Sequence, residues 1–318
     1  MPHRRSLFAA ALTALFARDA RAEQRFPSLS MFIPAGPGGG WDGLGRGIEQ
    51  VARGAGLVGN FQFENVGGAG GTVGLPRFVS ARRGRGDALM VSGSIMVGAV
   101  LTNKTPVGLQ NVVPVARLTE EAGVIVVPAA SPIRDVQGFL DALKANPGGT
   151  SVAGGSAGGT DHIALGLMLK ALGRTAREAS YVAFAGGGPA QAAILGAQVA
   201  AGISGLSEFA EQIKAGRMRA LATTGATRTD PAIPTLKESG VDVVITNWRG
   251  VFAPPGIRPE ALAKLVALMQ EVHALPAWAA LLATRDWTDA FMVGDEFAQF
   301  LDRDRAQTEA VLQEIGLA

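Results

Sequence analysis

Residues 33–42 read Ile-Pro-Ala-Gly-Pro-Gly-Gly-Gly-Trp-Asp. This stretch shows the local pattern by which much of the chain is expected to fold. The apolar run at 29–33 before it is typical of a buried strand, and the helical spacing of Leu44, Ile48 and Val51 after it predicts a helix. A loop between a strand and a helix exposes unpaired backbone N–H groups at the positive end of the helix dipole. Because glycines let a ligand oxygen approach those groups, the loop predicts a site for an anion.

Three more glycine-rich loops follow predicted strands, at 65–72, 154–160 and 185–189. Each half of the chain therefore carries two strand–glycine–helix units, which is an α/β pattern. Ligands of open α/β sheets bind at the carboxyl ends of the strands. We expect two similar lobes whose loops face a common cleft.

Other apolar runs complete this α/β pattern. Further strands are predicted at 88–92, 112–118, 123–127, 219–223 and 243–252, and late helices at 259–273, 277–285 and 295–315. A chain that crosses to the second lobe near 123–128 and returns near 245–252 would place these late helices on the first lobe.

The N-terminus has the pattern of a cleavable signal peptide over residues 1–22. A basic start is followed by an apolar segment at 7–17 that is too short to span a bilayer, and by the cleavage pattern Ala20-Arg21-Ala22. We therefore expect export, by the general or the twin-arginine route. A cytosolic N-terminal helix is the alternative, and no later segment has the length of a transmembrane helix.

Charge and cysteine content exclude several classes of function. Removal of the four arginines and one aspartate in residues 1–22 changes the formal net charge from +2 to −1, so the basic pI is no evidence for nucleic-acid binding. The absence of cysteine excludes a cysteine nucleophile, a cysteine–zinc site and an iron–sulfur cluster. Two histidines after the signal cannot form a conventional zinc site. We expect neither metal nor cofactor.

A dinucleotide site is one alternative for the first loop. Residues 38–43 fit Gly-x-Gly-x-x-Gly, and Glu64 stands where a ribose-binding acid belongs. However, residues 34–37 separate the strand from the pattern, and the bulky Trp41 lies where a pyrophosphate would pass. A lone match of this kind is weak.

An exported serine hydrolase is a second alternative. Residues 154–158, Gly-Gly-Ser-Ala-Gly, fit a nucleophile elbow around Ser156. The available histidines are His162, in the wrong chain order, and His273, on an amphipathic helix. Ser156 is better explained as a hydroxyl that binds a ligand, so we predict that the protein is not an enzyme.

Two pairs of residues have open roles. Asp42 and Asp161 each follow a glycine loop, where helix capping is favoured over a catalytic acid pair. Trp41 and Trp248 fit either the wall of a cleft or the core.

Five motifs in order carry a resemblance to a known family. They are residues 37–42, 64–71, 181–190 with Tyr181 and Gly-Gly-Gly-Pro-Ala, 234–240 (Pro-Thr-Leu-Lys-Glu-Ser-Gly) and 248–254 (Trp-Arg-Gly-Val-Phe-Ala-Pro). Over nearly the whole chain after the signal, the sequence resembles the substrate-binding proteins of tripartite tricarboxylate transporters, the Bug family.

This resemblance implies a two-lobed periplasmic-binding-protein fold of type II, which closes on its ligand like a Venus flytrap. Lobe 1 would comprise 23–123 and 250–318, and lobe 2 would comprise 124–249. It implies a periplasmic receptor, expected to be monomeric, that captures a di- or tricarboxylate or a related organic acid for membrane permease subunits. A ligand sensor for a signalling partner remains an alternative.

The resemblance and the strand ends together predict the binding residues. They are Ala35, Gly39, Gly40, Trp41, Asp42, Ser92, Ser94, Ser156, Gly159, Thr160, Asp161, Ala185, Gly186, Gly187 and Ser204. One ligand carboxylate would sit on the first loop and the far end would meet lobe 2. Many relatives carry Ser-x-x-His where this chain has Thr160-Asp161-His162. An extra acid there would repel a second carboxylate or bind a hydroxyl or amine, so the chemistry of the far end stays open.

Overall fold

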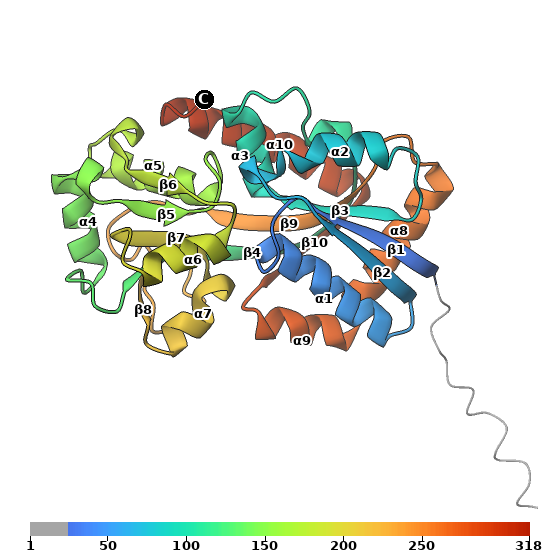
Figure 1. Cartoon of the computed structure of the whole chain (residues 1–318), viewed down its shortest axis with the longest axis horizontal. Helices are drawn as coiled ribbons and strands as arrows, with labels where there is room; N and C mark the ends of the chain where they lie inside the picture. The colour runs from blue at the N-terminus through green and yellow to red at the C-terminus, as the bar shows by residue number, and fades with distance from the viewer. Residues whose placement is uncertain (1–24) are drawn as a thin grey trace, which may run out of the picture.

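The computed structural model describes residues 25–318, and the predicted signal peptide lies outside them (Figure 1). The strands are β1 (Phe26–Ile33), β2 (Val58–Asn65), β3 (Ala88–Gly93), β4 (Val113–Pro128), β5 (Val152–Gly154), β6 (Tyr181–Ala183), β7 (Ala201–Gly205), β8 (Met218–Thr223), β9 (Thr246–Ala253) and β10 (Thr288–Val293). The α-helices are α1 (Gly40–Gly54), α2 (Gly74–Ala81), α3 (Ser94–Thr102), α4 (Val136–Ala145), α5 (Thr160–Ala171), α6 (Gly187–Leu195), α7 (Leu206–Lys214), α8 (Pro259–Ala274), α9 (Pro276–Thr284) and α10 (Gly294–Glu314).

The sheet has two halves that lie side by side (Figure 1). Its strand order is β2-β1-β3-β9-β4-β7-β5-β6, and β8 and β10 also pair with β4. Within the first half β1 runs parallel to β2 and β3, and within the second β5 runs parallel to β6 and β7. The carboxyl ends of these strands lead into the loops that begin α1, α5 and α6, which confirms the predicted α/β arrangement.

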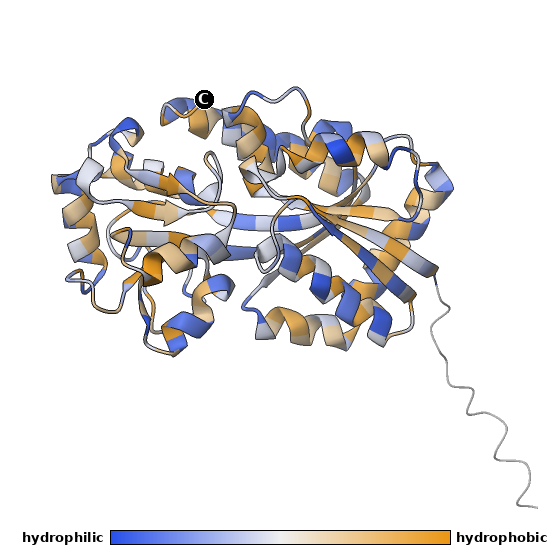
Figure 2. Cartoon of the chain, viewed as in Figure 1, coloured by the Kyte–Doolittle hydropathy of each residue, from blue (hydrophilic) through white to orange (hydrophobic). Residues whose placement is uncertain are grey.

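β4 is a single strand that passes from one half to the other, where the sequence predicts two strands at 112–118 and 123–127. It pairs with β9 as far as Ala122 and with β7 from Gly123 onward. Polar residues at 119–121 hide this continuity, because they interrupt the apolar pattern of the strand. They lie in the centre of the molecule, where β4 and β9 are hydrophilic (Figure 2).

The predicted lobe boundaries, 123/124 and 249/250, fall on these two strands. β4 and β9 pair in antiparallel orientation over the crossing, with Ala122 opposite Thr246. The division into two bodies that move stays a prediction.

Each half has its own apolar core, in which helices pack against the strands (Figure 2). The first core joins β1, β3 and α1 to α8 and α9, which return to this half as predicted. The second half holds two clusters, one built around α4 and α5 and one around α6 and α7.

The last turn of α10 departs from the prediction that all late helices lie on the first half. Phe297 near its start belongs to the first core, but Leu312 and Ile315 pack against Ile163 of α5 and Ala176. The C-terminus thus bridges the two halves (Figure 1). Helical spacing indicates which face of a helix is apolar, but not which neighbour covers it.

No single helix within residues 25–318 combines the length and the apolar composition needed to cross a membrane. α8 and α9 meet both criteria only when counted together, and the pair is bent by 71°.

Candidate functional site

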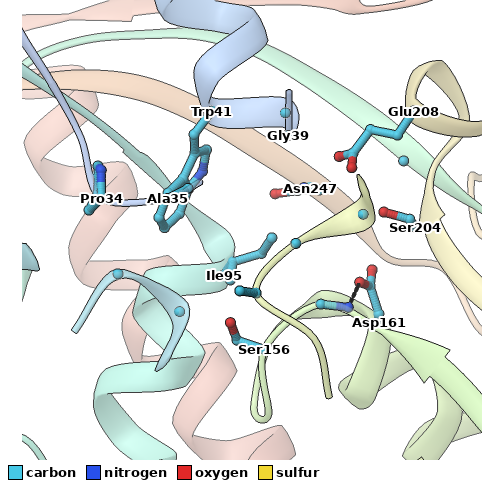
Figure 3. A pocket seen from close by; sticks show the side chains of 18 of the residues that line it. Pro34, Ala35, Gly39, Trp41, Ile95, Ser156, Asp161, Ser204, Glu208 and Asn247 are labelled. Carbon is cyan, nitrogen blue, oxygen red and sulfur yellow. Dashed lines mark hydrogen bonds between the residues drawn. The ribbon is translucent and has the colours of Figure 1, made fainter. Parts of the chain in front are cut away.

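A cavity of about 50 Å³ lies between the two halves. The loop before α1, the glycine turn after β2 and Ile95 of α3 form its wall in the first half. Loops before α5 and α6, the start of α7 and two residues of β9 complete it (Figure 3). The cavity therefore lies at the carboxyl ends of the parallel strands, as predicted.

The first loop brings the start of α1 to the cavity wall. Gly38 has a φ of +84°, a conformation that suits glycine, and Gly39 is extended and leads into α1 without a side-chain cap. The N–H groups of the first turn of a helix have no partner within that helix. Gly39, Gly40 and Trp41 line the cavity, so the positive end of the α1 dipole borders it.

Asp42 stabilises this loop from behind. Its carboxylate accepts hydrogen bonds from the N–H of Gly38 at 3.1 Å and from the amide of Asn65 at 3.0 Å, and Arg46 lies 3.5 Å away. Asp42 is buried but forms no part of the cavity wall. The N-cap of α1 is Gly39 and has no side-chain cap, so Asp42 holds the loop through Gly38 instead of capping the helix as predicted.

The second loop has the same backbone course but other side chains. Gly158 has a φ of +76°, and its N–H donates to Nδ1 of His162 at 3.2 Å. Burial lowers the pKa of His162 to about 4, so the neutral ring can accept that bond. The ring also stacks on Tyr181, with centroids 4.2 Å apart. His162 is thus packed against Tyr181 and holds the loop through Gly158.

Ser156 lines the cavity without a catalytic partner among residues 25–318. His162 already accepts the Gly158 N–H through Nδ1, and its low pKa makes it a poor general base. His273 pairs instead with Asp289 at 2.9 Å on another surface. The geometry therefore does not support the serine hydrolase.

Glu64, the candidate ribose-binding acid, is engaged in ion pairs. Its two carboxylate oxygens contact Arg77 at 2.5 Å and Arg82 at 2.7 Å. Trp41 forms part of the cavity wall at the glycine loop, whereas Trp248 packs in the core beside Phe297. The ion pairs of Glu64 and the place of Trp41 in the wall both argue against a dinucleotide site.

A buried arginine lines the cavity. Arg249 of β9 is only 1% exposed, and its Nη2 lies 2.5 Å from Oε1 of Glu121 and 3.6 Å from Oε1 of Glu208. Its guanidinium packs against Gly40, where any larger residue would collide with it. Nε and Nη1 have no protein hydrogen-bond partner among the described residues. The pair with Glu121 places a compensated charge directly beneath the first loop.

Two acids on the second half have raised pKa values. Burial raises the pKa of Asp161 to about 6, against the hydrogen bond from the N–H of Gly155. Burial also raises the pKa of Glu208 to about 7, with Arg249 opposing and the charges of Glu121 and Asp161 adding to the effect. Both carboxylates face the cavity (Figure 3).

The structure brings most of the predicted binding residues together. The cavity wall includes Ala35, Gly39, Gly40, Trp41, Ser156, Asp161, Ala185, Gly186, Gly187 and Ser204. Their direct contact with a ligand stays a prediction.

The other predicted residues lie outside this wall. Ser92 is fully buried and donates to Met96, and Ser94 accepts the N–H of Trp248 at 2.9 Å. Asp42 is turned into its own loop, Gly159 is the N-cap of α5, and Thr160 lines a smaller neighbouring cavity. Strand-end position alone did not reveal which way these groups face.

Sequence reasoning missed Glu208, Asn247 and Arg249, which all line the cavity. The run Asn247–Gly250 interrupts an apolar strand, and this polar break was an available signal. For Glu208 the only available signal in the sequence was its position one turn after the end of β7. Among residues 25–318 no group of three or more His, Cys, Asp or Glu side chains could hold a metal ion.

The chain matches the family described as tripartite tricarboxylate transporter family receptor over residues 53–317. Protein BugT of Bordetella pertussis is 26% identical over 294 residues, which cover 91% of this chain and 89% of BugT. A Cupriavidus necator protein described as "UPF0065 protein in gbd 5'region" is 30% identical over 196 residues, covering 61% of this chain and 59% of that protein.

Solved structures agree with the fold. The periplasmic binding protein BugD superposes with a TM-score of 0.81 at 22% identity, covering 91% of this chain and 98% of BugD. R. palustris Rpa4515 with adipate gives 0.82 at 20% identity, covering 91% of this chain and 97% of that one. The fold is that of the periplasmic binding proteins of this type. Since the family match spans most of the sequence, the chain belongs to the tripartite tricarboxylate transporter receptor family.

Proposed function

We propose that this protein is a periplasmic receptor, exported by a cleavable signal, that binds a small organic carboxylate and delivers it to the membrane subunits of a tripartite transporter. The observation that carries this proposal is the cavity between the halves, whose wall includes Gly39, Gly40 and Trp41 at the start of α1. Backbone N–H groups at a helix start bind carboxylates well. The adipate held by a protein of the same fold supports the same ligand class.

We further propose that binding closes the molecule. A ligand that contacts both halves stabilises the closed arrangement, because only that arrangement makes both sets of contacts. The lobes would be 23–123 with 250–318, and 124–249, hinged about β4 and β9. The contact of the α10 end with α5 would then have to adjust during opening. We expect a monomer in solution and no catalytic activity.

The test is a thermal-shift panel of mono-, di- and tricarboxylates, amino acids and aromatic acids, followed by calorimetry on the hits. We expect at least one organic acid to raise the melting temperature, since a ligand that binds only the folded state stabilises it. The proposal fails if NAD raises the melting temperature and no organic acid does. Loss of uptake of the bound acid after deletion of the gene would support delivery to a transporter, whereas a sensor would leave uptake intact.

A variant pair tests the first loop. A side chain at Gly39 meets no atom within 4 Å, so Gly39→Val should fold but obstruct the N–H groups beside it. We expect about a tenfold or greater loss of affinity. Gly36→Val is the matched control, because Gly36 is equally unhindered and lies outside the cavity wall. Equal affinities of the two variants would contradict a carboxylate site on this loop.

A further inference from the structure

The second half of the cavity carries acids where helix starts would otherwise receive an anion. Asp161 is the second residue of α5, and its carboxylate accepts the N–H of Gly155 at 2.8 Å. The carboxylate of Glu208 packs against Gly187, the first residue of α6, so closely that a side chain there would overlap it. The favourable positions for negative charge are thus already taken by the chain itself.

The charges around this wall do not balance. Glu121, Asp161 and Glu208, from β4, α5 and α7, are accompanied by one cation, Arg249 of β9. The shorter contact of Arg249 is to Glu121, at 2.5 Å against 3.6 Å to Glu208. Burial is the main cause of the raised pKa values of Asp161 and Glu208, and the charge of Glu121 raises both further. A second ligand carboxylate would meet repulsion here.

Acceptor atoms without a protein partner line the same wall. Oε2 of Glu208 and Oδ1 of Asn247 are buried and make no hydrogen bond with the described residues. Asn247 is only 7% exposed, and both side chains reach into the cavity (Figure 3). Buried acceptors of this kind are normally satisfied by a donor. The unpaired Nε and Nη1 of Arg249, whose guanidinium packs against Gly40, put further donors beside the first loop, whereas Glu208 and Asn247 offer acceptors.

We propose that the ligand carries a single carboxylate, held by the N–H groups at Gly39–Trp41, and a nitrogen that donates hydrogen bonds at its far end, an ammonium or a primary amide, held by Glu208 and Asp161. This inference rests on the proposed function, because it assumes a carboxylate on the first loop. It narrows the ligand class from organic acids in general to amino acids and acid amides, and it disfavours dicarboxylates.

The proposal has a pH dependence with a definite sign. Arg249, Glu121, Asp161 and the hydroxyl of Ser204 are the charged and polar groups that act on Glu208. Its pKa of about 7 means that the carboxyl loses its proton between pH 6 and pH 8. Affinity for an ammonium ligand should therefore rise over that range, whereas affinity for a dicarboxylate should fall.

The decisive experiment is calorimetry of the purified protein at pH 8 with two series of matched length. The six-carbon series is adipate, 6-aminohexanoate, the monoamide of adipic acid and hexanoate, and the four-carbon series is succinate, 4-aminobutanoate, succinamate and butanoate. We expect an amine or amide member to bind about tenfold or more tightly than the dicarboxylate of its series. A dicarboxylate that binds as tightly or more tightly overturns the inference but leaves the proposed function standing. Failure of every acid here and in the wider panel overturns both.

Glu208→Gln tests the assigned residue, with Glu211→Gln as the control because Glu211 lies exposed on the same helix. Glu208→Gln should cost an ammonium ligand about tenfold in affinity and flatten the pH dependence between 6 and 8. Glu211→Gln should change neither. An unchanged ratio of ammonium to dicarboxylate affinity in Glu208→Gln would contradict the assignment. The wild-type ligand series decides the question even if this variant folds poorly.

Discussion

The loop before α1 and the loop before α5 follow the same backbone course. Gly38 and Gly158 have φ values of +84° and +76°, and the extended residues that follow, Gly39 and Gly159, both have a ψ of 175°. At the equivalent position four residues on, each loop accepts the glycine N–H, through Asp42 in the first and His162 in the second. The two helix starts are therefore alike in their main chain.

Their side chains give the two loops opposite chemistry. The cavity-facing residue is Trp41 in the first loop and Asp161 at the equivalent place in the second. The first loop keeps its carboxylate, Asp42, behind the backbone, beside Arg46. A glycine loop at a helix start can thus bind an anionic ligand only when no carboxylate of the chain itself occupies that position. The residue at one position, Trp41 or Asp161, decides between these two outcomes.

The largest effect should come from the arginine that accompanies the acids of the second half. Arg249→Met leaves Glu121 buried without its partner, so we expect a loss of roughly 3–5 kcal/mol in the free energy of unfolding, measured by urea denaturation at pH 8. Arg249→Met with Glu121→Gln should recover part of it. The matched change in the first loop, Arg46→Met, should cost under about 1 kcal/mol, because Arg46 is exposed. Equal losses of unfolding free energy in Arg249→Met and Arg46→Met would contradict the contrast between the two loops.

The cavity-facing acid should make stability depend on pH. The pKa of Asp161 is about 6 in the folded state, above its ordinary value, so its favourable contribution is present below about pH 4 and lost as pH rises through 6. Asp161→Asn should therefore gain stability over the wild type between pH 4 and pH 8, by roughly 1–3 kcal/mol. Urea denaturation across this range measures the difference. A gap that is independent of pH would show that Asp161 is not a buried acid.

The histidine of the same loop should act with the opposite sign. Burial lowers the folded-state pKa of His162 to about 4, so its contribution is present above about pH 6.5 and lost as pH falls toward 4. Asn can still accept the Gly158 N–H, and His162→Asn should narrow its stability gap to the wild type by about 1–2 kcal/mol on acidification. His273→Asn is the control, because His273 is the other histidine among residues 25–318 and lies away from this loop, paired with Asp289. A constant gap would mean that His162 titrates normally.

The smallest effect should come from the hydroxyl of the second loop. Ser156→Ala removes one neutral hydrogen-bonding group from the cavity wall, which is worth roughly 0.5–1.5 kcal/mol in ligand affinity. Calorimetry should show a weaker ligand and an unchanged fold. Loss of an ester-hydrolysing activity in this variant would instead support the hydrolase.

Much of the fold followed from local patterns. The strand–glycine–helix units and the α8 and α9 boundaries to within one or two residues depend on residues near each other in sequence. The continuous strand β4 was missed, because Glu121 breaks its apolar pattern while being buried against Arg249. In a sequence, a charged residue of a buried ion pair cannot be told from one in a solvated turn until its distant partner is known.

The sequence by itself determined where the chain turns, where helices begin and which loops offer N–H groups, because these depend on φ preferences, caps and short-range periodicity. Only the tertiary structure decided the charge of the cavity. Glu121, Asp161, Glu208 and Arg249 come from four elements, and their burial and pKa shifts arise from long-range contacts that no local pattern encodes. The two glycine loops are alike in sequence and backbone, but their surroundings give one side of the cavity donors and the other side acceptors.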